Sequence, residues 1–183
     1  MGMIDEEKLL EELRNPITSR RGFAALVSEY SERLYWQIRK MVLSHDDAND
    51  ILQDVFIKAW INLENFRGES KLTTWLYRIA INESITFLNK KRTQNNVSID
   101  DEDTFLLNTI ESDEYFDGDE AQKLLQKAIL TLPDKQRLVF QLKYFEEMKY
   151  EDMSDILGTS VGALKASYHH AVKKIEKILG DPD

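Results

Sequence analysis

Residues 150–179 read YEDMSDILGTSVGALKASYHHAVKKIEKIL, and they indicate the architecture of the second half of the chain. Apolar residues recur every three or four positions on both sides of Gly158, which predicts a short helix followed by a longer one. Gly158 suits a left-handed helix stop, and Ser160 suits the cap of the next helix. Two helices joined by such a turn predict a helix-turn-helix.

In a helix-turn-helix the second helix enters the DNA major groove and its first residues reach base edges. The candidate contact residues at the start of this helix are Ser160, Gly162, Ala163, Lys165, Ala166 and His169. The small residues allow close approach, and Lys165 suits a phosphate or a guanine edge. The same pattern also fits a helical hairpin that binds nothing, so the motif alone leaves DNA binding open.

Helical spacing of apolar residues continues through most of the remaining chain. It marks one face from Phe23 to Val42, a second from Ile51 to Leu63, and a third from Leu72 to about Leu88. After residue 121 it returns in two helices, the first ended by Pro133. The sequence therefore predicts an all-α fold of two small helical domains, the second containing the helix-turn-helix.

An acidic segment separates these two helical regions. Residues 93–120 hold ten of the 33 acidic residues and no Lys or Arg, so the flanking regions are close to neutral although the formal net charge is -9. We interpret the segment as a linker, with an N-terminal domain at 1–92 and a C-terminal domain at 121–183. Because binding depends on the local field, the overall acidity does not exclude nucleic acid as a ligand.

Several classes of protein are disfavoured by what the sequence lacks. There is no cysteine, which excludes disulfides and thiolate zinc sites and fits a reducing compartment. No stretch approaches the roughly 18 apolar residues of a membrane span, so we expect a cytoplasmic protein with no direct membrane insertion. There is no Gly-rich phosphate loop, HExxH motif or nucleophile elbow. We expect no enzyme activity and no cofactor.

Residues 65–78, NFRGESKLTTWLYR, combine aromatic and basic side chains around a glycine. Aromatic rings for base stacking and cations for phosphates are what single-stranded nucleic acid requires. The simpler interpretation is that Trp60, Trp75 and Leu76 are core residues and that the cations are solvated. We expect both to hold, with Trp75 packing inward while the polar groups of the loop face outward.

Three carboxylates on one predicted helix, Asp47, Asp50 and Asp54, allow three interpretations. Their spacing by three and four residues suits a hard metal ion. Acidic residues near a helix start are also favoured by the helix dipole alone, and this solvated face is preferred over a metal site. With Gln53 beside them, they further suit a protein-docking surface.

Taken together, the motifs resemble those of extracytoplasmic-function sigma factors of bacterial RNA polymerase. The resemblance is carried by DANDILQDVFIKAW (47–60), FRGESKLTTWLYRIAIN (66–82), FLNKKR (87–92) and the segment from Leu132 to Ile175. It covers roughly residues 20–92 and 121–179, and its motifs occur in the family's order. The stretch after Lys165 departs from the family, because a histidine and a valine replace two expected arginines.

The resemblance implies a function for each motif. It implies that one helix binds the clamp helices of core RNA polymerase through Asp47, Asp50, Gln53, Asp54 and Phe56. It implies that the melted minus-ten element, with a flipped base, is bound by Asn65, Phe66, Arg67, Gly68, Ser70, Lys71, Arg78, Asn82, Lys90, Lys91 and Arg92. The helix-turn-helix residues named above would read the minus-35 element as duplex. An anti-sigma factor is the implied regulator, and catalysis belongs to the polymerase.

Two alternatives remain at this point. A stand-alone helix-turn-helix regulator would bind duplex DNA without needing a single-strand loop. A metal-dependent hydrolase would use Asp47, Asp50 and Asp54 with His45, and would bind divalent metal tightly. We expect no metal, and we expect promoter DNA and core polymerase as partners.

Overall fold

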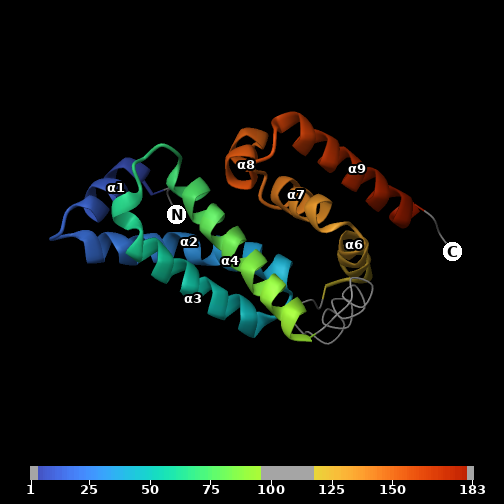
Figure 1. Ribbon diagram of the computed structural model, residues 1–183, viewed down its shortest axis with the longest axis horizontal. Helices are drawn as coiled ribbons and strands as arrows, with labels where there is room; N and C mark the ends of the chain where they lie inside the picture. The colour runs from blue at the N-terminus through green and yellow to red at the C-terminus, as the bar shows by residue number, and fades with distance from the viewer. Residues whose placement is uncertain (1–3, 96–117, 181–183) are drawn as a thin grey trace.

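The computed structural model describes residues 4–95 and 118–180, and these residues form helices joined by short loops without any strand among them (Figure 1). The helices are α1 (Glu6–Arg14), α2 (Ser19–Val42), α3 (His45–Ile61), the 3-10 helix η1 (Leu63–Asn65), α4 (Leu72–Asn95), α6 (Glu120–Leu130), α7 (Asp134–Tyr144), α8 (Tyr150–Leu157) and α9 (Val161–Gly180). The predicted all-α fold is confirmed.

Helices α1 to α4 form the first unit, in which the long helices α2, α3 and α4 pack on one another. Their apolar faces meet in a core that excludes solvent. It includes Leu26, Leu34, Ile38, Val55, Leu76 and Ile81, none of which is exposed. These are the positions at helical spacing in the sequence, so burial of one stripe per helix explains why the three helices associate.

Helices α6 to α9 form the second unit, and α8 with α9 makes the helix-turn-helix. Gly158 has a φ of 64°, the left-handed conformation that ends α8. Ser160 caps α9, because its Oγ accepts a hydrogen bond from the Ala163 amide at 3.2 Å. Behind the motif lies a small core of Ala128, Ile129, Leu132, Phe140, Ala171 and Ile175.

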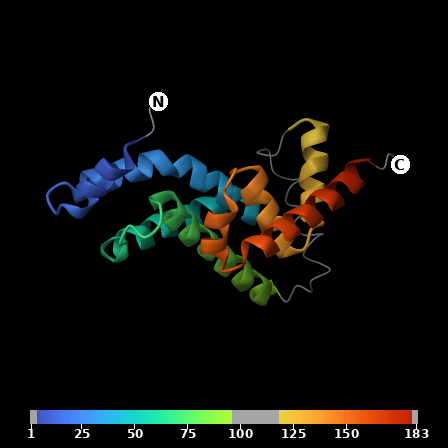
Figure 2. The same ribbon diagram turned by 90° about the horizontal axis from the view of Figure 1, so that it is seen from above.

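The two units pack against each other, with α8 beside α4 and α7 beside α2 (Figures 1 and 2). Val139, Leu142, Met153 and Leu164 of the second unit are buried in the same apolar cluster as the core of the first. No helix within the described ranges has the length and apolar character to cross a membrane.

The helix ends differ slightly from the predicted domain limits. Helix α4 continues to Asn95, beyond the expected end near Leu88 and the predicted boundary at residue 92. Residues 89–95 contain no Gly or Pro, so nothing in this stretch ends the helix. Most of the predicted acidic linker, residues 96–117, lies outside the described residues.

Candidate nucleic-acid and polymerase interfaces

The loop between η1 and α4 presents its polar residues to solvent and its aromatic residue to the core. Asn65, Arg67, Gly68 and Lys71 are exposed, and Ser70 is half-buried. Gly68 has a φ of 76°, a conformation that other residues rarely adopt. The turn at Gly68 therefore holds two cations, Arg67 and Lys71, on the outside of the loop.

Phe66 supports this loop from beneath. It is only 8% exposed, and its ring lies 5.0 Å from the ring of Trp75 with the planes tilted by 43°. Trp75 itself is half-buried, as the sequence led us to expect. Phe66 was predicted to contact DNA, and in the structure its ring is buried and packs beneath the loop.

The residues predicted along α4 have different surroundings. Asn82 and Lys90 are exposed. The Arg78 guanidinium donates to the carbonyl of Asp155 in α8 at 3.0 Å. Arg92 pairs with Asp134 of α7 at 2.9 Å. Two of the predicted minus-ten residues are thus held by the second unit.

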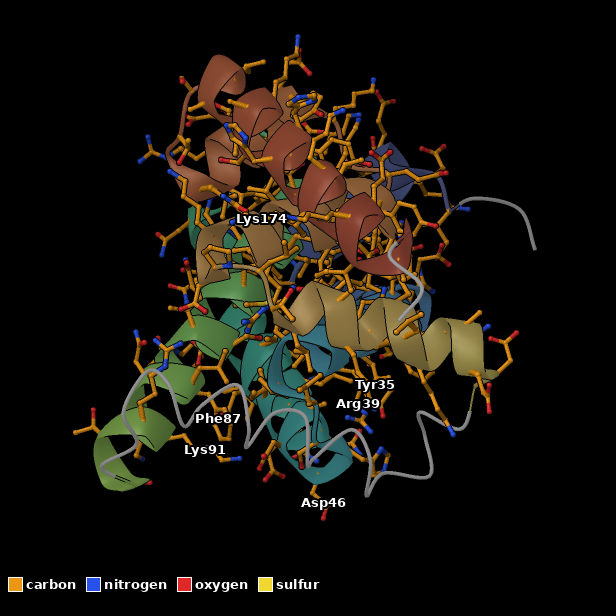
Figure 3. All side chains as sticks on the ribbon, turned by 90° about the vertical axis from the view of Figure 1, so that its right-hand side faces the viewer. Tyr35, Arg39, Asp46, Phe87, Lys91 and Lys174 are labelled. Carbon is orange, nitrogen blue, oxygen red and sulfur yellow. The ribbon has the colours of Figure 1, made fainter. Side chains whose placement is uncertain are left out.

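Lys91, near the end of α4, pairs with a residue of α3. Its Nζ lies 3.4 Å from an oxygen of Asp47, in the first turn of α3. Lys91 and Phe87 lie beside each other near the end of α4 (Figure 3). The Lys91 ammonium lies 5.7 Å from the ring centroid of Phe87. The ion pair between Lys91 and Asp47 thus joins a residue predicted to bind DNA to a residue predicted to bind polymerase.

The outer face of α3 carries the remaining predicted polymerase residues. Asp50, Gln53 and Asp54 are exposed, whereas Asp47 is half-buried. Phe56 is 9% exposed and meets the ring of Phe23 edge-on, with the ring centroids 6.3 Å apart. The structure therefore keeps Asp50, Gln53 and Asp54 accessible, pairs Asp47 with Lys91 and places Phe56 in the core behind them.

Sequence reasoning missed the apolar residues exposed on this helix. Ile57 is 57% exposed and Ile61 is 68% exposed, next to the acidic row. Trp60, predicted to be in the core, is 42% exposed. Ile57 and Ile61 fall outside the apolar stripe of α3, and that departure from the periodicity was the available signal.

Metal binding by the acidic row finds no matching geometry. Within residues 4–95 and 118–180, no three His, Asp or Glu side chains converge in a way that could hold an ion. His45 instead contacts the Tyr35 hydroxyl through Nδ1 at 2.7 Å and the Asn49 amide through Nε2 at 3.1 Å.

The start of α9 is an open surface. The residues predicted there for duplex DNA, Ser160, Gly162, Ala163, Lys165, Ala166 and His169, are all exposed. The opposite face of the helix is buried through Leu164, Ala171 and Ile175. The Lys165 ammonium lies 5.7 Å from the ring centroid of Tyr150 in α8. One face of α9 is thus packed on the rest of the second unit, and the opposite face is exposed to solvent.

A contact between the two units, centred on Glu146, was not predicted. Its carboxylate accepts from Lys40 at 3.1 Å and from the Tyr77 hydroxyl at 2.7 Å. The Glu146 side chain is 10% exposed. Burial, and secondarily the Glu146 carboxylate, raises the pKa of Tyr77. The Tyr77 hydroxyl therefore stays protonated and donates a hydrogen bond to Glu146. No local sequence pattern predicts that Glu146 contacts Lys40 and Tyr77, because these residues are far apart in the chain.

Comparisons with known proteins agree with this arrangement. The family described as Sigma-70 region 2 matches residues 26–94, and Sigma-70, region 4 matches residues 122–175. The chain is 32% identical to the ECF RNA polymerase sigma factor SigW of Bacillus subtilis, covering 87% of this chain and 90% of that protein. It is also 32% identical to the RNA polymerase sigma-H factor of Pseudomonas aeruginosa, over 95% and 93% of the two chains.

Solved structures share the fold. The sigma factor RpoE of Bartonella quintana, in complex with the anti-sigma factor NepR, superposes with a TM-score of 0.69 at 24% identity, covering 88% of this chain and 98% of that one. CnrH in complex with the cytosolic domain of CnrY gives a TM-score of 0.69 at 21% identity, over 96% and 97%.

Proposed function

We propose a role in transcription initiation for each surface of this chain, which belongs to the extracytoplasmic-function group of the sigma-70 family. The chain is therefore an RNA polymerase sigma factor. The first unit binds core polymerase and captures the melted minus-ten element. The second unit reads the minus-35 element as duplex. The chain itself catalyses nothing, since a sigma factor directs the polymerase that does the chemistry.

The observation that carries this proposal is the loop at residues 66–71. Two exposed cations, Arg67 and Lys71, stand on a turn that Phe66 anchors to the core. A loop fixed in this way can hold an unstacked base and its phosphates without first becoming ordered. Capture offsets part of the unstacking cost, which is about a few kcal/mol per base. Asn65, Gly68, Ser70, Asn82 and Lys90 complete the proposed surface, and Arg78, Lys91 and Arg92 join it when their present contacts with Asp155, Asp47 and Asp134 open.

The exposed start of α9 supports the minus-35 assignment. Gly162, Ala163 and Ala166 have no long side chain to hold the helix away from the groove floor. Lys165 and His169 are then the polar groups available for base edges or phosphates. Ser160, at the helix cap, is placed for a phosphate contact.

The exposed face of α3 is the surface proposed for core polymerase. Asp50, Gln53 and Asp54 supply polar contacts, and Asp47 joins them if its pair with Lys91 opens. We assign Phe56 the role of fixing α3 from below. The proposed activity implies a cytoplasmic location, because the polymerase works there.

An anti-sigma factor is the proposed regulator. A cavity of about 410 Å³ between the units suits such a partner, because apolar side chains of both units line it. They include Met41, Ile85 and Leu88 of the first unit and Leu138 and Leu157 of the second. Apolar side chains from a helix of the partner would fill the cavity and hold the units together. Leu88→Glu would then weaken binding of the anti-sigma factor. An unchanged affinity for the anti-sigma factor would show that it does not bind in this cavity.

Replacing both Arg67 and Lys71 with Ala tests the proposed function. We expect the double variant to bind core polymerase normally but to lose promoter opening, measured by permanganate reactivity of thymines in the minus-ten region. Lys8→Ala with Lys177→Ala removes the same charge elsewhere and should leave opening unchanged.

A stand-alone duplex-binding regulator predicts a different result, because it does not need the loop. In that case the double variant would regulate and bind duplex DNA like the wild type. Normal promoter opening by this variant would contradict the proposed role of the loop.

A further inference from the structure

We propose that helix α1 is a working part of the single-strand site, in which Glu6 positions the loop 66–71 and Arg14 supplies a cation for a phosphate of the captured strand. This inference rests on the proposed function of the loop. No motif in residues 1–19 indicates a role for this segment. In the structure the Glu6 carboxylate contacts the start of α4, and the Arg14 guanidinium lies near Gly68 in the loop.

Helix α1 is fixed firmly enough to position other groups. Leu9 and Leu13 are buried in the core of the first unit. Helix α2 approaches α1 closely at Gly22, where a Cβ atom would stand 3.1 Å from the backbone nitrogen of Leu13. The Thr18 hydroxyl donates to the carbonyl of Glu12 at 2.8 Å and closes the turn between the helices. Side chains on α1 therefore have a defined place relative to the core.

Glu6 caps a helix distant in sequence. Its Oε1 accepts a hydrogen bond at 2.5 Å from the amide of Leu72, the first residue of α4. The first amides of a helix lack partners within the helix, and the positive end of the helix dipole favours a carboxylate there. This bond fixes the point at which the loop passes into α4, directly after Lys71. Glu6 thus acts on the loop through the backbone.

Arg14, at the other end of α1, lies against the turn of the loop. Its Nη2 is 3.5 Å from the position that a Cβ of Gly68 would occupy. Among the described residues, no carboxylate forms an ion pair with Arg14. A cation in the last turn of a helix also complements the helix dipole, but that role does not require contact with this loop.

A cavity of about 700 Å³ lies beside Arg14, between α1, the end of α3 and the base of the loop. Trp60, Ile61 and Phe66 contribute apolar surface to it, and Glu64 is the carboxylate in its lining. The cavity has room for an unstacked nucleotide next to the guanidinium. A planar guanidinium binds phosphate oxygens in a bidentate manner, so Arg14 would extend the row of cations that begins with Arg67 and Lys71.

The test uses the complete chain bound to core polymerase. The probe is a fluorescent DNA single strand of about 12 nucleotides, selected from a random pool by the wild-type complex. We expect Arg14→Ala to weaken binding about five- to tenfold and to reduce the slope of log K against log salt concentration by about 0.7, the loss of one single-strand phosphate contact. Lys8→Ala, which removes the same charge from the same helix, should change neither quantity.

Glu6 has a different expected signature, because it touches no phosphate. Glu6→Ala should weaken single-strand binding several-fold with no change in the salt slope and none in duplex minus-35 binding. Glu6→Gln keeps an acceptor oxygen and should restore most of the single-strand affinity.

The Arg67→Ala variant distinguishes a failure of the proposed role of α1 from a failure of the proposed function of the loop. If Arg67→Ala weakens binding while Arg14→Ala behaves like Lys8→Ala, the role of α1 is overturned and the proposed function stands. If Arg67→Ala and Arg14→Ala both leave binding intact, the loop does not capture the strand and both proposals are overturned.

Discussion

Phe56 and Phe66 each support a polar surface from the core side. Both are less than 10% exposed, and each meets another aromatic ring, Phe23 or Trp75 respectively. The helical spacing of α3 groups Phe56 with its apolar stripe, whereas the family resemblance groups it with the docking residues. Burial favours the first interpretation, because a side chain enclosed by the core has little surface left for a partner.

A pair of substitutions on α3 separates support from contact. Phe56→Ala should lower the free energy of unfolding by about 3–5 kcal/mol, because it opens a cavity in the core. Asp54→Ala should change that free energy by less than about 0.5 kcal/mol while weakening the affinity for core polymerase. Urea denaturation and polymerase pull-down measure the two effects. A Phe56→Ala protein of normal stability that fails to bind polymerase would show direct contact by Phe56.

Helix α8, its turn and α9 could be predicted from the sequence because their determinants are local. Gly158 ends one helix and Ser160 caps the next, and both are recognisable by residue type and position. Contacts between distant segments could not be predicted in this way. The bond from Leu72 to Glu6 joins residues 66 positions apart, and no periodicity encodes such a pairing. The candidate surfaces were therefore foreseen, but not the contacts that hold them.

Two glycines of the helix-turn-helix should respond in opposite directions to alanine. Gly158 has a φ of 64° and open space around it, so Gly158→Ala suffers backbone strain alone and should lose about 1 kcal/mol of stability. Gly162 also has open space but lies within α9, so Gly162→Ala should gain up to about 0.5 kcal/mol. Thermal unfolding of both variants checks the signs. Equal effects would contradict the assigned turn.

The packing of the two units against each other bears on how the proposed minus-ten and minus-35 surfaces could be occupied together. The elements are separated by about 25 base pairs, or roughly 85 Å of duplex at 3.4 Å per base pair. Here Arg78 of one unit bonds directly to α8 of the other, and Glu146 joins Lys40 to Tyr77. If each unit binds its proposed element, we therefore expect the units to move apart before both elements are bound.

Glu146→Ala should favour the separated arrangement, because it removes both hydrogen bonds from this contact. The chain has no cysteine, so single cysteines introduced at Asn82 and His170 can carry fluorescent labels without side reactions. We expect lower energy transfer between the labels in the variant than in the otherwise wild-type labelled protein. Lys177→Ala, away from the contact, is the control. Unchanged transfer would show that Glu146 does not hold the units together.

Reconstituted transcription tests the central claim most directly. The purified chain is added to bacterial core polymerase with fragmented genomic DNA, and the 5′ ends of the RNA are sequenced. The account predicts new ends that share two upstream elements at fixed spacing, and loss of these ends with the Arg67→Ala, Lys71→Ala variant. Binding to core polymerase without any new ends, or new ends that survive the loop variant, would contradict it.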